Sequence, residues 1–194
     1  MHTPIGEDRT ELRLPLIVNT AFWDRLADGR IAWSALDKDR VFIHSPAGRL
    51  ERIVSHAAWR IQSMSDADRV ALVGVYRKAR NQPTGPLPSN VDVPERLPTI
   101  TGLRASPDGG FWVQRMGPAD AIPPSVLNNS ANTGWLGGPL WDVFDSAGRS
   151  LGTVRLPDRF RITRLTTNGA VGVQKDDLDV ERVVRLTVRH RPRD

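Results

Sequence analysis

Cysteine is absent from this chain of 194 residues, which excludes disulfide bonds, Cys-ligated zinc, iron–sulfur clusters and thiol catalysis. Long apolar runs are absent too: the stretch 14–18 is interrupted by Pro15 and is far too short to cross a bilayer. The N-terminal residues contain no basic segment followed by an apolar one, so no secretion signal is expected, and the compartment stays open.

Lysine is scarce, and the basic residues are almost all arginine. The exceptions are Lys38, Lys78 and Lys175. The net charge is +5, but the 27 basic residues are spread among 22 acidic ones, whereas nucleic-acid binding needs a concentrated basic patch. The densest basic stretch, 185–193, is interpreted as a strand edge that runs into a solvated tail, with phosphate or membrane-surface binding as the alternative. We therefore expect no nucleic-acid partner and no membrane span.

Motifs for catalysis are missing as well. The chain has no Gly-x-Ser-x-Gly elbow, no glycine-rich phosphate loop and no His-Glu-x-x-His, and its four histidines are isolated from one another. The best metal candidate is the acidic stretch 176–181, because hard cations prefer clustered oxygen ligands. It lacks the glycine and the terminal glutamate of an EF-hand, and aspartates are common in hairpin turns, so a turn is the favoured interpretation. We predict no catalytic, cofactor-binding or metal-binding residue.

Glycine turns next to short β-branched and aromatic segments are what the sequence does contain. Residues 11–20 alternate weakly and predict a strand with an edge proline. The turn Asp28-Gly29 precedes a strand that contains Trp33, and two further strands follow on either side of the turn 45–49. These segments predict a first antiparallel sheet within residues 11–58.

The hydrophobic period then changes to that of a helix. Ser65 is an N-cap with Asp68 three residues later, and apolar residues recur on one face until about residue 82. Five prolines follow within 81–98 and predict an extended connection. We interpret residues 62–96 as a helical insertion with a proline-rich linker.

Two more units of short strands follow the insertion. The first spans 97–157, with the turn Asp108-Gly109 before Trp112 and a long irregular loop at 116–140. The last unit, 158–190, has a turn at Asn168-Gly169 and strands on both sides, but no segment for an outer fourth strand.

The recurring order of strand, Asp-Gly turn, aromatic strand, second strand, Ala-Gly-Arg turn and outer strand resembles a blade, the four-stranded sheet of a β-propeller. It is similar to bacterial six-bladed β-propeller proteins of the NHL and TolB-like type. The matching segments are Asp28-Gly29 with Trp33, Asp108-Gly109 with Trp112, 141–145 with Gly148-Arg149, and 151–157. The resemblance implies an all-β fold, a partial β-propeller of about three antiparallel sheets with one inserted α-helix, equivalent to the C-terminal half of such a protein.

Three blades do not close a ring, because a propeller needs at least four. The chain is therefore interpreted as a fragment or as a half-ring that needs a partner. Its unpaired strand edges lead us to expect an edge-to-edge homodimer or aggregation.

The expected function is that of a binding or interaction scaffold for an unknown protein or small-molecule ligand. The candidate contacts are Trp135, in the irregular loop, and Arg115. The alternative is a propeller-type hydrolase or lactonase. The resemblance to gluconolactonase-like propellers implies a divalent ion, Ca²⁺, at the axis of the full ring, in a site that missing blades or a second chain would complete. Proteins of the resembling type are often exported.

Overall fold

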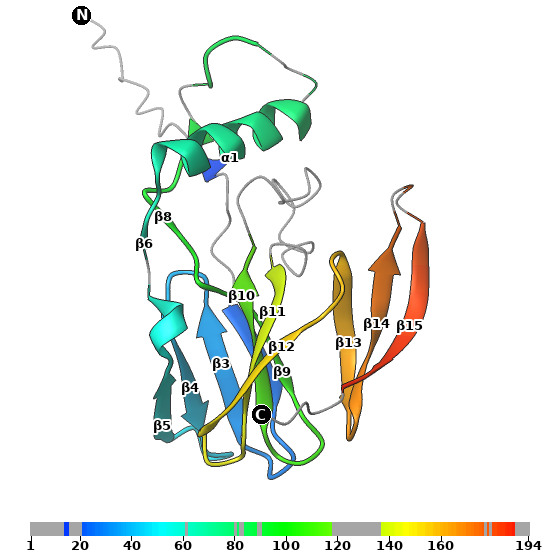
Figure 1. The fold of residues 1–194 in the computed structure, drawn as a ribbon. Coiled ribbons are helices and arrows are strands. Elements are labelled where there is room, and N and C mark those ends of the chain that lie inside the picture. Colours follow the sequence, from blue (N-terminus) through cyan, green and yellow to red (C-terminus); the bar gives the residue numbers. More distant parts are fainter. Residues whose placement is uncertain are drawn as a thin grey trace, which may run out of the picture.

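Three antiparallel sheets and one α-helix make up the chain in the computed structural model, and Figure 1 shows the sheets side by side with the helix at one end. The structure describes residues 14–15, 21–60, 62–79, 81, 84–88, 91–117, 137–176, 178 and 180–188. The prediction of a mostly β fold with about three antiparallel sheets and one helix is confirmed.

The first two sheets have four strands each, and both run as a simple meander in which every strand pairs with the next. The strands of the first sheet are β2 (Ala21–Arg25), β3 (Ile31–Ala35), β4 (Arg40–His44) and β5 (Leu50–Ser55). Those of the second are β9 (Ile100–Ala105), β10 (Phe111–Met116), β11 (Gly137–Phe144) and β12 (Ser150–Arg155).

The third sheet is a meander of three strands within the described residues. They are β13 (Phe160–Thr166), β14 (Gly169–Lys175) and β15 (Glu181–Thr187). The sheet ends after the strand that the sequence predicts as the last.

The remaining elements join the first sheet to the second. They are η1 (Ala57–Trp59), β6 (Gln62–Ser63), α1 (Asp66–Ala79), β7 (Val91–Asp92) and β8 (Arg96–Leu97). The predicted N-cap is present: the Ser65 hydroxyl accepts a hydrogen bond from the Asp68 amide at 3.1 Å and donates one to the Asp68 carboxylate at 2.6 Å. Leu72 and Tyr76 of α1 are buried, as the helical period predicts.

The second sheet is covered on both faces. One face packs on the first sheet through a cluster that includes Val41, Ile43, Phe111, Val113 and Phe144. The other face packs on the third sheet through a second cluster, which consists chiefly of Trp112, Trp141, Phe160, Ile162 and Leu165. Trp112 and Trp141 are buried between the second and third sheets, at 8% and 2% exposed.

Two sequence expectations differ from the structure. In the predicted strand 11–20, the described residues β1 (Leu14–Pro15) pair in parallel with β7, and the first sheet begins at β2 instead. Trp33 does not pack between the sheets of this chain, because it lies on the face of the first sheet that points away from the second. The sequence alignment of Trp33 with Trp112 is wrong by one residue, and one residue along a strand reverses the face.

Candidate functional site

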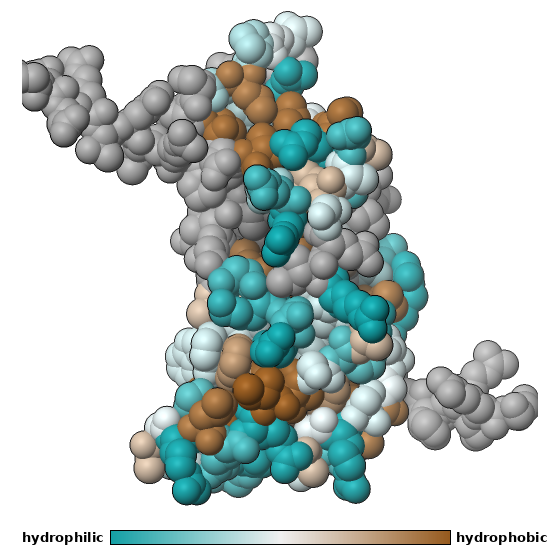
Figure 2. Space-filling view, turned by 90° about the vertical axis from the view of Figure 1, so that its left-hand side faces the viewer, coloured by the Kyte–Doolittle hydropathy of each residue, from teal (hydrophilic) through white to brown (hydrophobic). Residues whose placement is uncertain are grey.

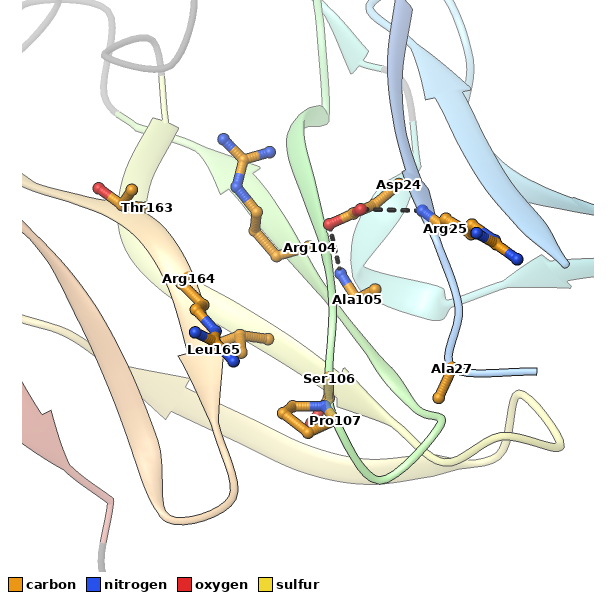
Figure 3. Close-up of a pocket in the computed structure, with 10 residues that line it drawn as sticks. All are labelled: Asp24, Arg25, Ala27, Arg104, Ala105, Ser106, Pro107, Thr163, Arg164 and Leu165. Carbon is orange, nitrogen blue, oxygen red and sulfur yellow. Dashed lines mark hydrogen bonds between the residues drawn. The ribbon is translucent and has the colours of Figure 1, made fainter. Parts of the chain in front are cut away.

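The first strands of the three sheets converge on one open pocket of about 410 Å³. Asp24 comes from β2, Arg104 from β9, and Thr163 and Arg164 from β13 (Figure 3). Each of these polar residues is the fourth or fifth residue of its strand, so they lie at similar positions along the three strands. The pocket is a site to which all three sheets contribute.

Asp24 fixes one wall of the pocket. Its carboxylate accepts hydrogen bonds from the amides of Ala105, at 2.9 Å, and Arg25, at 2.8 Å, and so joins β2 to β9. The Arg25 side chain points away from Arg104 and Arg164, as Figure 3 shows. The carboxylate is therefore engaged with the backbone, and the charge that faces the pocket comes mainly from the other two arginines.

Arg104 is held between β9 and β13. One of its Nη atoms donates to the Leu103 carbonyl at 2.7 Å, and its Nε donates to the Ile162 carbonyl at 3.4 Å. Burial lowers the pKa of Arg104, the neighbouring cation Arg161 lowers it further, and Asp24 opposes both effects. A guanidinium in this environment is still protonated at neutral pH, and a bound anion would favour its charged form.

Arg164 is exposed at the rim of the pocket. No carboxylate of the described residues lies within ion-pairing distance of Arg164 or Arg104. The two arginines make the lining of the pocket rich in hydrogen-bond donors, and such a lining can accept a carboxylate or phosphate.

Arg115, which the sequence suggests as a ligand contact, lies instead in a polar cluster of the second sheet. Its Nε and an Nη donate to the Asp142 carboxylate at 2.8 and 2.5 Å. That carboxylate is fully buried, and it also accepts from Trp59 Nε1 and from the Thr153 hydroxyl, both at 2.7 Å. Arg115 therefore satisfies a buried acid that ties η1 to the second sheet.

The hydrogen bonds of this cluster decide the charge state of Asp142. Burial alone would raise the pKa of Asp142, but the donors Arg115, Thr153 and Trp59, together with the positive charge of Arg115, hold it below its ordinary value. The same pair raises the pKa of Arg115. Asp142 is thus a buried carboxylate that the fold keeps ionised.

The other candidates from the sequence carry less. Trp135 lies outside the described residues, and so do Asp177 and Asp179 of the acidic stretch. Asp176 accepts hydrogen bonds from the amides of Leu178 and Val180, both at 3.0 Å, as a turn residue does. In the described part of the chain no three His, Asp or Glu side chains gather as a metal site would require, and no helix is long and apolar enough to span a membrane.

Comparison with known proteins finds no match for this chain among family models, curated proteins or solved structures.

The sequence gives little signal for the pocket, because Asp24, Arg104 and Arg164 lie far apart along the chain. The one available signal is positional: each lies in the first strand of its sheet. Sequence reasoning missed Asp142 as well, although it is the one charged residue of β11.

Proposed function

We propose that this chain is a partial β-propeller that acts as a binding scaffold, and that it binds an anionic group in the pocket between β2, β9 and β13. Three consecutive meanders, stacked face to face with their first strands adjacent, support the propeller arrangement. The pocket lies where the first strands of the three sheets and the loops that follow them come together, and loops held by a rigid scaffold often carry binding residues.

The observation that carries the proposal is the pair of arginines from two different sheets. Arg104 and Arg164 line one pocket, and the one carboxylate among its described lining residues, that of Asp24, already accepts hydrogen bonds from two backbone amides. A carboxylate or phosphate of a ligand would offset this excess of positive charge. The ligand is expected to be a small acidic molecule or an acidic side chain of a partner protein.

Calorimetric titration with inorganic phosphate tests the proposal. Saturable binding by the wild-type chain should weaken about tenfold or more in Arg164→Gln, and similarly in Arg104→Gln, because each loses charge-assisted hydrogen bonds. Arg149→Gln is the matched control, since Arg149 lies in a turn of the second sheet and its side chain is 82% exposed. Equal weakening in the control would show general charge attraction, and unchanged binding in both pocket variants would refute the site.

The two pocket variants separate binding from folding. Arg164 is exposed, so its replacement should leave thermal unfolding unchanged, whereas Arg104 also donates to two backbone carbonyls and its loss should lower the melting temperature slightly. Loss of phosphate binding in Arg164→Gln at unchanged stability would attribute the effect to the ligand.

A further inference from the structure

Among the residues that the structure describes, no element covers one face of each of the two outer sheets. The second sheet has both faces occupied, so the third sheet cannot reach the first inside one molecule. The open face of the first sheet carries one cross-strand row of Trp23, Trp33, Phe42 and Ile53 from β2 to β5, and Arg25, Ile31 and His44 form the next row. Trp23 is 65% exposed and Ile53 50% exposed.

Figure 2 views the molecule from the side of the first sheet and shows an apolar patch framed by hydrophilic residues in its lower half. On the open face of the first sheet, Trp33 and Phe42 are stacked with ring centroids 4.7 Å apart. An exposed aromatic patch of this kind marks an interaction surface, because burying it in a partner removes apolar area from water.

The buried interface between the first and second sheets shows what such an aromatic face packs against. There the second sheet presents Phe111 and Phe144, paired on β10 and β11 and stacked at 5.1 Å. The first sheet covers them with the β-branched side chains of Val41, Ile43 and Val54. Trp33 and Phe42 are a stacked aromatic pair on the open face of β3 and β4, two residues away along these strands from Ile31 and His44, which occupy the positions of Phe111 and Phe144.

The third sheet carries a complementary open face. One of its rows joins Arg161, Val173 and Val183, and the next joins Arg164, Val171 and Arg185. Its valines are β-branched like those that cover Phe111 and Phe144, and Val183 is 80% exposed. The arginines favour aromatic rings through cation–π contacts and disfavour pairing of two such faces with each other.

We propose that a second copy of this chain covers both open faces, with the first sheet of each copy packed on the third sheet of the other. Two such contacts close the pair around a twofold axis, so that no open face is left over. The contact places β-branched side chains on aromatic rings, as the interface between the first and second sheets does, and it shares Arg164 with the anion pocket.

Sedimentation equilibrium of the full chain across the micromolar range tests this arrangement. The wild-type chain should form a dimer. Ile53→Arg should weaken it about tenfold or more, because the new cation faces Arg164 and Arg185, whereas Ile53→Glu should weaken it less. Val183→Asp, on the opposite face, should also weaken it about tenfold. Leu151→Arg is the control, since Leu151 is 61% exposed on the outermost strand of the second sheet.

Mixing the two weakened variants sharpens the test. A mixture of Ile53→Arg and Val183→Asp contains one unmodified contact per pair and places the new acid opposite the new base in the other, so it should dimerise more tightly than either variant alone. A monomer at all concentrations would overturn the proposal. So would a dimer that Val183→Asp leaves intact, because this result would indicate that two first sheets pair with each other. A dimer that neither variant weakens would indicate edge-to-edge pairing and would overturn it as well. Far-ultraviolet circular dichroism verifies that each variant is folded.

Discussion

The first and second sheets contain the same two turns, but residues at corresponding positions of their strands are buried to different extents. Gly29 and Gly109 both have φ of +88°, and in each turn the glycine amide donates to the carbonyl three residues earlier. The turns at Gly48 and Gly148 also match, with φ of +81° and +73° and the same hydrogen bonds.

These turns align the strands residue by residue. Ile31 corresponds to Phe111, Trp33 to Val113 and His44 to Phe144. In the second sheet these positions are 0%, 0% and 2% exposed, because the first sheet covers them, whereas in the first sheet all three are only half-buried. The difference shows that burial here depends on the neighbouring sheet more than on the local sequence. Substitutions at corresponding positions should therefore have unequal effects.

The largest inequality is expected for the aromatic positions that follow the Asp-Gly turns. Phe111→Ala should lower the free energy of unfolding by about 4 kcal/mol, because it removes a fully buried ring that stacks on Phe144. Ile31→Ala should cost about 1 kcal/mol in the monomer, where that side chain has no covering sheet. Urea unfolding at low-micromolar concentration measures both, and equal losses would contradict the comparison.

Protein concentration then connects this pair to the proposed dimer. If a second copy covers the first sheet, the loss of unfolding free energy caused by Ile31→Ala should increase with protein concentration. The loss caused by Phe111→Ala should not increase in this way, because Phe111 is already covered within one chain.

A second inequality concerns charge. Asp142 of the second sheet corresponds to Phe42 of the first, so a buried ion pair stands where the first sheet has an aromatic ring. Asp142→Asn should cost about 3 kcal/mol at neutral pH, because Arg115 loses its carboxylate partner inside the fold. Urea unfolding measures the loss, and Asp158→Asn is the control, since the Asp158 side chain is 74% exposed.

The same carboxylate predicts the response to acid. Its pKa is lowered in the folded chain, so its contribution to stability is fully present above about pH 4, the ordinary value in an unfolded chain, and is lost as the pH falls through the folded value. The melting temperature of the wild-type chain should therefore fall more steeply below about pH 4 than that of Asp142→Asn. Parallel profiles would show that Asp142 is not responsible.

Much of the fold could be predicted from turns and hydrophobic periods. Gly29, Gly48, Gly109 and Gly148 mark where strands reverse, and a positive φ at each explains why glycine is needed there. The face of the sheet on which Trp33 lies could not be predicted from its position after a turn. The two Asp-Gly turns align the following strands residue by residue, but the tryptophans of these strands are at different positions in the alignment. The pocket was beyond sequence reasoning, since it depends on how three first strands pack, and that packing has no local pattern.

The smallest inequality is expected at the Ala-Gly-Arg turns. A Cβ at Gly148 would lie 2.7 Å from Val54 Cγ2 of the first sheet, whereas one at Gly48 would meet nothing within 4 Å. Both glycines have a positive φ, so alanine should cost about 1 kcal/mol at either position through backbone strain. Gly148→Ala should cost about 1 kcal/mol more, because Val54 is buried and has to shift. Chemical unfolding of the two variants measures the difference. Val54→Ala removes the clash. In the Val54→Ala background, Gly148→Ala should therefore lower the free energy of unfolding only as much as Gly48→Ala does in the wild-type chain. A larger loss would place the strain in the turn itself and not in the contact between the sheets.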